Sequence, residues 1–170
     1  MGTAIRQRRY TADYLSVSGK LEFMGTGFTQ VDDSPSATTT SKRYINMVSE
    51  SQSVTGYAWS APFTFDEIDS EKAIAYLVKI GKEELLGDDA ETDYITVDLS
   101  ATKGEKGYPA RKRHVAVEIS EFTDSDGNIE GSGNLLAKGD WEFGYFAVDN
   151  TTFTADDTAK TEFSYAKALA

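Results

Sequence analysis

Two segments of the chain alternate strictly between apolar and polar residues. In residues 94–99 (YITVDL) and 114–119 (HVAVEI), an apolar side chain occupies every second position. Successive side chains of a β-strand point to opposite faces, so a period of two gathers the apolar set on one face. We therefore predict that both segments are strands with one face in the core and the other toward solvent.

Shorter segments rich in β-branched and aromatic residues predict further strands. These segments are residues 14–17, 21–24, 44–48, 54–59 and 135–148. The Ser-rich stretch between 44–48 and 54–59 favours a hairpin made of those two segments. The sequence DSDGN at residues 124–128 favours a tight hairpin turn.

One segment, residues 70–80, has the pattern of an amphipathic helix. Apolar residues at positions 73, 74, 77 and 78 fall on one stripe, Asp69 or Ser70 can serve as the N-cap, and Gly81 follows as a stop signal. Seven or eight short strands with this one helix predict a mainly β fold. The expected architecture is an antiparallel β-sandwich or small barrel with the helix on its flank.

Three polar segments have no pattern that would place them in a core. Residues 1–13 are predicted to be an N-terminal arm, residues 31–50 a long projecting loop or hairpin, and residues 150–170 a C-terminal tail. The 170-residue length fits a single domain, residues 1–170, that carries these extensions.

The distribution of charge bears on which partners the chain can bind. The net charge is −11, which argues against binding nucleic acid through its phosphates. All charged residues among the first ten are nevertheless basic, namely Arg6, Arg8 and Arg9. They could pair with the acidic body of a neighbouring copy.

The sequence has no signal for a membrane or for export. No apolar run approaches the ~20 residues that span a bilayer, and no apolar stretch follows Arg8 and Arg9 as a Sec or Tat signal requires. We expect no membrane association.

The residues that could perform chemistry are few. The chain has no cysteine and a single histidine, His114, so a metal site or nucleophilic triad lacks partners. The segment that begins at Asp124 lacks the Gly and Glu spacing of a calcium loop, and no phosphate-binding Gly-rich motif occurs. We therefore expect no enzyme activity, no cofactor and no metal. Trp59 and Trp141 leave open a carbohydrate-binding module, if both rings are exposed.

Large aromatic residues near the ends of the chain suit another purpose. Tyr10, Tyr14 and Tyr165 lie in or beside the terminal segments. An amphipathic ring at such a position can anchor one subunit on another. We therefore count these three tyrosines, with the N-terminal arginines, as candidates for an assembly interface.

The order of many short motifs resembles a known family. The motifs are FMGTGFT (23–29), SPSA (34–37), SKRYIN (41–46), VTGY (54–57), PF (62–63), RKRHVAVEISEF (111–122), GSGN (131–134), GDWEFG (139–144) and TFT (152–154). Together they are similar to the major tail proteins, or tail tube proteins, of long-tailed bacteriophages and prophages of Gram-positive bacteria. The resemblance covers most of the chain and includes no catalytic signature.

The resemblance implies a structural virion protein. It implies hexameric rings joined by sheet extension and stacked by the arms and the long loop, which adds Pro35, Lys42, Arg43 and Tyr44 to the interface candidates. The implied partners are other copies of the chain, a tape measure protein and tail-end proteins, with DNA passing through the lumen without specific binding. The implied location is the phage tail, after synthesis in the host cytoplasm. A tube or baseplate component of a contractile or secretion system is the alternative.

Overall fold

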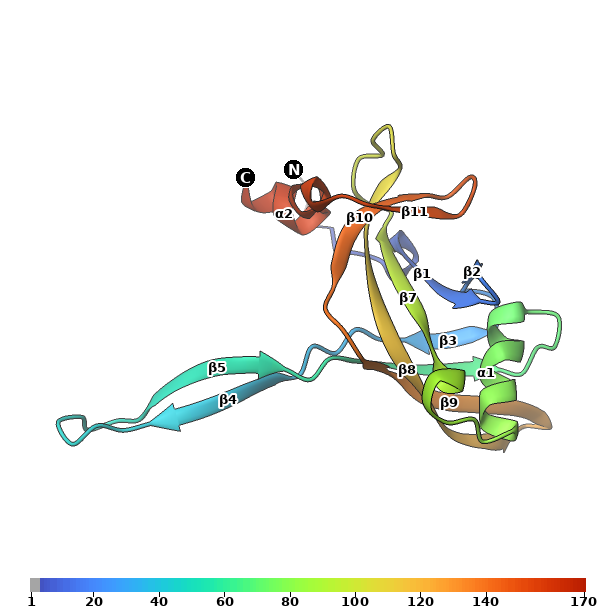
Figure 1. Ribbon diagram of the computed structural model, residues 1–170, viewed down its shortest axis with the longest axis horizontal. Coiled ribbons are helices and arrows are strands. Elements are labelled where there is room, and N and C mark those ends of the chain that lie inside the picture. Colours follow the sequence, from blue (N-terminus) through green and yellow to red (C-terminus); the bar gives the residue numbers. More distant parts are fainter. Residues whose placement is uncertain (1–3) are drawn as a thin grey trace.

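The computed structural model describes residues 4–170 and confirms a mainly antiparallel β fold (Figure 1). Its strands are β1 (Thr11–Val17), β2 (Lys20–Phe23), β3 (Phe28–Val31), β4 (Ala37–Lys42), β5 (Ser51–Tyr57), β6 (Ser60–Asp66), β7 (Glu91–Asp98), β8 (Tyr108–Ser125), β9 (Asn128–Ala137), β10 (Glu142–Ala147) and β11 (Thr152–Ala155). The helices are α1 (Lys72–Lys82) and α2 (Ser164–Leu169), and short 3₁₀ turns are η1 (Arg8–Tyr10), η2 (Gly87–Ala90) and η3 (Asp157–Thr161).

Nine of the strands form one curled sheet: seven follow the order β2-β1-β7-β8-β9-β6-β3, and β10 and β11 join it beside β8. Strand β8 is long enough to serve two partners in succession on one edge. Its first half pairs with β10, which carries β11, and its second half pairs with β9. The sheet therefore curls into a half-barrel, which is the form that the predicted sandwich or barrel takes.

The sheet buries side chains on both faces where β1 and β7 run side by side. Leu15 and Tyr94 face a core cluster covered by α1, while Tyr14, Ile95 and Val97 face a second cluster on the opposite side with Phe146 of β10. The alternation in residues 94–99 thus separates two cores, whereas it was expected to separate a core from solvent.

Helix α1 packs on the sheet as expected, with shifted ends. Its N-cap is Glu71, beyond both predicted candidates, Asp69 and Ser70. The buried stripe ends in Ile80, while Val78 is only half-buried. Gly81 lies inside the helix. A Cβ atom there would sit 2.7 Å from the Phe122 ring and 2.8 Å from Ile119, so this glycine permits close approach of helix and sheet.

Strands β4 and β5 form a separate two-stranded hairpin that extends far from the body, on the side opposite α1 (Figure 1). The predicted strand at residues 44–48 is wrong, because these residues make the turn region at the end of the hairpin. The partner of β5 is instead the Thr-rich stretch Ala37–Lys42, which belongs to the segment predicted to be a projecting loop or hairpin.

Both terminal segments fold onto the body more than their composition predicted. Thr11, Ala12 and Asp13 of the expected arm belong to β1, and Ala12 and Asp13 are buried. In the expected tail, β11 pairs with β10, and Ala159 and Phe163 are buried. Residues 1–3, the start of the predicted arm, lie outside the described residues.

Candidate assembly surfaces

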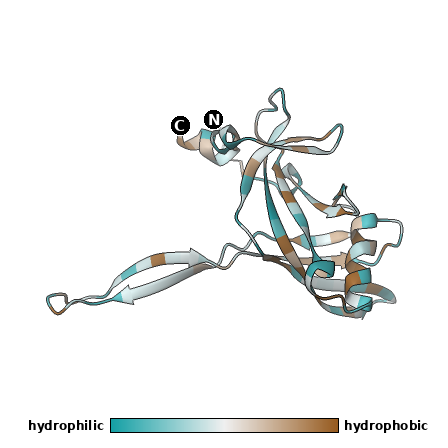
Figure 2. Cartoon of the chain, viewed as in Figure 1, coloured by the Kyte–Doolittle hydropathy of each residue, from teal (hydrophilic) through white to brown (hydrophobic). Residues whose placement is uncertain are grey.

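A bulge in the hairpin gives it one apolar face. The register shifts between Thr38, which pairs with Gly56, and Thr39, which pairs with Val54. Val54 and Tyr57 are three residues apart and would point to opposite faces of a regular strand. The bulge brings both to the face that also carries Ala37 and Thr39. Val54 and Tyr57 are 55% and 68% exposed, and Figure 2 shows that the remainder of the two strands is pale or polar.

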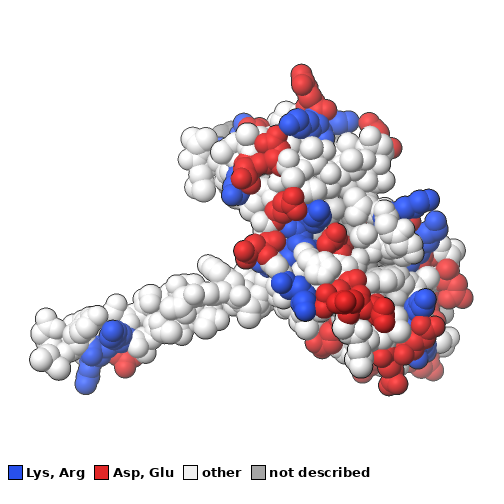
Figure 3. All heavy atoms as spheres, viewed as in Figure 1, with Lys and Arg blue, Asp and Glu red and all other residues white. Residues whose placement is uncertain are grey.

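The far end of the hairpin, residues 42–50, is here called the hairpin tip. It carries the predicted candidates Lys42, Arg43 and Tyr44, and the Lys42 Nζ atom lies 5.3 Å from the centre of the Tyr44 ring. Ile45 and Val48 are almost fully exposed beside them. Figure 3 shows cationic side chains at the tip, while the hairpin strands between tip and body carry no charge.

The hairpin root, residues 33–36, holds the β4–β5 hairpin to the sheet through Asp33. One carboxylate oxygen accepts a hydrogen bond from the Trp59 ring nitrogen at 2.5 Å, and the other accepts one from Arg111 at 2.6 Å. Ser34 and Ser60 exchange two backbone hydrogen bonds of 2.9 Å. The candidate Pro35 lies in this root. These contacts tie the hairpin to β8 through a residue that sequence reasoning did not single out.

The N-terminal arginines bind acids of their own chain. Arg6 donates to the Asp98 carboxylate at 2.7 Å, and Arg8 pairs with Asp13 and donates to the Val31 carbonyl oxygen at 3.1 Å. Arg9 extends over the ring of the half-exposed Tyr10, at 5.2 Å from the ring centre. Arg6 and Arg8 are therefore paired within their own chain, whereas the sequence led us to expect pairing with a neighbouring copy.

The acids that hold these arginines are buried. Asp13 also accepts a hydrogen bond from the Tyr94 hydroxyl at 2.5 Å, and burial with the nearby carboxylate raises the pKa of Tyr94 well above its ordinary value. Asp98 is 4% exposed. Burial alone would favour its neutral form, but hydrogen bonds from Ser164 and Ser100, with the charge of Arg6, hold the pKa of Asp98 below its ordinary value.

The remaining two tyrosine candidates differ in exposure. Tyr14 is 7% exposed and packs on Phe146 at 4.4 Å between ring centres, so it belongs to the core and is not available as an exposed anchor. Tyr165 on α2 is 57% exposed and stacks on the buried Phe163. The structure thus gathers Arg6 and Tyr165 at the chain ends and places Lys42, Arg43 and Tyr44 far away at the hairpin tip.

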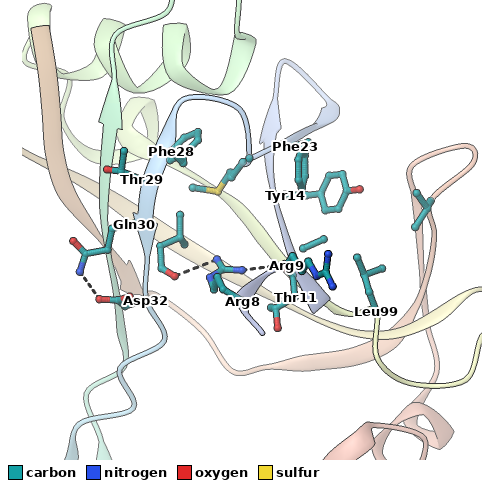
Figure 4. Close-up of a pocket in the computed structure, with 15 residues that line it drawn as sticks. Arg8, Arg9, Thr11, Tyr14, Phe23, Phe28, Thr29, Gln30, Asp32 and Leu99 are labelled. Carbon is teal, nitrogen blue, oxygen red and sulfur yellow. Dashed lines mark hydrogen bonds between the residues drawn. The ribbon is translucent and has the colours of Figure 1, made fainter. Parts of the chain in front are cut away.

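An apolar groove opens where the curled sheet fails to close, between β3 and the β1–β2 edge (Figure 4). It encloses about 480 Å³, and its walls include Tyr14, Phe23, Phe28 and Leu99, with Arg8 and Arg9 at one end. We call it the seam groove. Sequence reasoning missed it because its walls come from strands whose meeting depends on the curl of the whole sheet.

The tryptophans do not form a sugar-stacking platform. Trp59 is buried and lies edge-on to Trp141, at 5.0 Å between ring centres. The Arg111 guanidinium covers Trp141 at 4.0 Å, and the Arg113 guanidinium lies 4.6 Å from the same ring. The exposed pair of rings that a carbohydrate-binding module requires is therefore not present.

His114 takes part in a surface ion network on β7 and β8. Its Nδ1 lies 3.0 Å from Asp93 and its Nε2 lies 3.1 Å from Glu91, which also pairs with Lys138 at 3.0 Å. The Asp93 hydrogen bond is the main cause that raises the pKa of His114, and Glu91 adds to it.

Within residues 4–170, no group of three or more His, Cys, Asp or Glu is arranged to hold a metal ion. Over the same residues, no helix is both long and apolar enough to cross a membrane.

Comparisons with known proteins identify a fold and no family. The sequence matches no protein-family model and no curated protein. The structure is similar to a chain in the cryo-EM structure of the anti-feeding prophage (AFP) baseplate, 6-fold symmetrised. The alignment covers 85% of this chain and 98% of the other, with a TM-score of 0.54 and 8% sequence identity. At that identity, the likeness is one of overall fold.

Proposed function

We propose that this chain is a structural subunit of a phage tail or a related contractile assembly, with no catalytic role. The observation that carries the proposal is the projecting hairpin. Every residue of β4 and β5 except Gly56 is exposed, and an isolated two-stranded hairpin is marginally stable in water. A contact with another subunit would stabilise the hairpin and cover Val54 and Tyr57.

The finer form of the proposal is a tail tube. Copies of the chain would join into hexameric rings, and the rings would stack into a tube through which DNA passes. The motif resemblance supports this form, and the net charge of −11 fits a lumen that repels DNA. The tape measure protein and tail-end proteins would then be the further partners, and the phage tail the location.

A baseplate component is the second candidate. It is favoured by the fold likeness to a chain of a baseplate, described as 6-fold symmetrised. Both candidates require the chain to associate, and they differ in what its rings contact. Purified protein that forms stacked rings alone would favour the tube, while single rings that stack only with other tail proteins would favour the baseplate.

Association can be tested through the two faces of the hairpin. We expect the double substitution Val54→Asn, Tyr57→Asn to weaken self-association by at least about tenfold, because each apolar side chain contributes about 1.5–3 kcal/mol when fully buried. Sedimentation velocity over a concentration series measures this. Thr38→Asn with Ser53→Asn is the matched control on the opposite face and should associate as the wild type does.

Two results would contradict the proposal. One is a wild-type protein that remains monomeric at every concentration. The other is equal association of both double variants with the wild type, which would show that the apolar face of the hairpin makes no subunit contact.

A further inference from the structure

Two arginines of β8 share one face of the sheet. Side chains alternate along a strand, so Arg111 and Arg113 point to the same side and Lys112 points to the other. Both guanidinium groups lie against Trp141, at 4.0 and 4.6 Å from its ring centre, and that of Arg113 also lies 5.2 Å from the centre of the Trp59 ring. Arg113 lies between the part of β8 that pairs with β10 and the part that pairs with β9 (Figure 1). The two arginines therefore meet where β8 exchanges one partner strand for the other.

The two arginines differ in what they bind. Arg111 donates a hydrogen bond to Asp33 at 2.6 Å. Arg113 forms no ion pair with any residue from 4 to 170, and its Nε atom is buried without an acceptor. The two terminal nitrogens of Arg113 also have no acceptor among these residues, but they are not buried. Arg113 is thus a partly buried cation whose outer N–H groups are open to a ligand.

The charges around Arg113 leave it uncompensated. Burial and the charge of Arg111 lower the pKa of Arg113, while the charges of Asp140 and Asp33 act in the opposite direction. Asp33 already accepts hydrogen bonds from Arg111 and Trp59. A cation that is removed from water without a paired anion is unfavourable, and an anion that reaches it is held more strongly than in bulk water.

We propose that Arg113 binds an oxyanion, which is a carboxylate or a phosphate group, at its two accessible nitrogens. The planar guanidinium group matches the spacing of oxygen atoms in such groups. Contact with Trp59 and Trp141 holds the plane of this group before a ligand arrives, which lowers the entropy lost on binding. The stacked rings favour the cation but give its terminal N–H groups no acceptor, and an oxyanion supplies one. The ligand is either a free ion or an acidic side chain of a second copy, since both present the same oxygen atoms.

The tryptophans report directly on this site. Trp59 and Trp141 are the only tryptophans of the chain, and both lie within 5.2 Å of the Arg113 guanidinium. We expect inorganic phosphate and acetate, each titrated into dilute protein, to change the tryptophan fluorescence until the change saturates. Sodium chloride at the same ionic strength should produce no saturating change. This titration does not require the chain to associate, so it is independent of the proposed function.

Substitutions at and beside Arg113 make the titration specific. Arg113→Gln should weaken phosphate and acetate binding at least about tenfold, because hydrogen bonds from a charged donor are lost. Arg113→Lys keeps the charge but lacks the planar group, so it should also bind both ions more weakly than the wild type. Lys112→Gln is the matched control on the opposite face and should respond as the wild type does. Asp140→Asn should bind phosphate more tightly, because a nearby negative charge is removed.

Sedimentation velocity in phosphate and in chloride distinguishes the two sources of the ligand. Weaker self-association in phosphate and in Arg113→Lys identifies an acidic side chain of a second copy, and unchanged association identifies a free ion. Both results support the site. Circular dichroism melting shows which variants are folded, and Arg113→Lys replaces Arg113→Gln if the latter is not. Wild-type fluorescence that responds to neither oxyanion, or a folded Arg113 variant that binds both as tightly as the wild type, overturns the inference.

Discussion

Asp98 joins three segments that are far apart in the chain. Its carboxylate accepts hydrogen bonds from Arg6, from Ser100 and from both the backbone N–H and the hydroxyl of Ser164. It therefore ties the N-terminal segment and the start of α2 to the end of β7. Figure 1 shows the N-terminal end of the described chain beside α2, as this junction requires.

Removing the charge of Asp98 should loosen both ends of the chain. We expect Asp98→Asn to lower the free energy of unfolding by about 1–3 kcal/mol, because the donors of Ser164 and Arg6 lose their buried, charged acceptor. The folded pKa of Asp98 lies below 3.8, so its contribution is present above that pH and is lost as the pH falls through the folded pKa. Urea unfolding of both proteins at neutral and acidic pH measures these effects.

Asp149→Asn is the control for this prediction. Asp149 is 91% exposed and makes one contact of 3.7 Å with Lys103, so its loss should change the unfolding free energy by less than about 0.5 kcal/mol. Equal stability of Asp98→Asn and the wild type at neutral pH would show that the junction contributes nothing.

His114 should give a pH dependence of the opposite sign. Its folded pKa lies above 6.5, so its stabilising contribution is full below that pH and is lost as the pH rises through the folded pKa. We expect an NMR titration of this single histidine to show a midpoint above 6.5. The stability difference between about pH 6 and about pH 8 should shrink in His114→Gln. A midpoint at or below the ordinary value would contradict the observed ion network.

The hairpin illustrates what local patterns can and cannot predict. The apolar cluster at residues 44–48 looks like a strand, but it forms the exposed tip. The Thr and Ser run before it looks like a loop, but it forms β4. Strand patterns describe half-buried surfaces, and neither β4 nor β5 has a core to pack on in the single chain. Within the segment 31–50, the hairpin from Ala37 onward projects, whereas Val31 belongs to β3 and is buried in the core.

Local patterns predict correctly the elements whose residues lie close together in the sequence. The Asp-Gly turn joins β8 and β9 as predicted, with Asp126 and Gly127 at φ +52° and +85° and the Gly127 N–H donating to Asp124. The alternating segments became β7 and the middle of β8. The docking of α2 was missed because the start of this helix is held by Asp98, 66 residues before Ser164.

The direction of the hairpin should depend on Asp33. We expect Asp33→Ala to broaden the distribution of distances between hairpin and body, and to reduce stability by only about 1 kcal/mol because the carboxylate is half-exposed. Cysteines introduced at Ser53 and Ser120 can carry spin labels, since the chain has no other cysteine. Double electron–electron resonance between the two labels then measures the width of the distance distribution.

Asp32→Ala provides the comparison for this measurement. Asp32 is adjacent in sequence, but its side chain accepts a hydrogen bond from Gln30, whereas Trp59 and Arg111 donate to Asp33. Its loss should leave the distance distribution narrow. Identical widths in the wild type and Asp33→Ala would show that the backbone ladder at Ser34 and Ser60 alone orients the hairpin.

Across the molecule, charge and shape are distributed unevenly. The acidic end of the body around α1 and the hairpin with its cationic tip lie at opposite ends (Figures 1 and 3). The composition predicted an acidic body and projecting segments. It could not predict which segment projects from which end, because that depends on the curl of a sheet assembled from strands across the whole chain. The proposed function rests on the resemblance to tail proteins and on the likeness to a baseplate chain, because no single residue of the candidate surfaces indicates it.

Electron microscopy of the purified protein at high concentration tests the central claim most directly. A structural subunit of a tail should form rings, and a tube subunit should form stacked rings about as wide as a phage tail. Class averages should show the hairpin of each copy in contact with a neighbour. Fields of isolated single subunits at all concentrations, with a monomer mass in solution, would contradict the account.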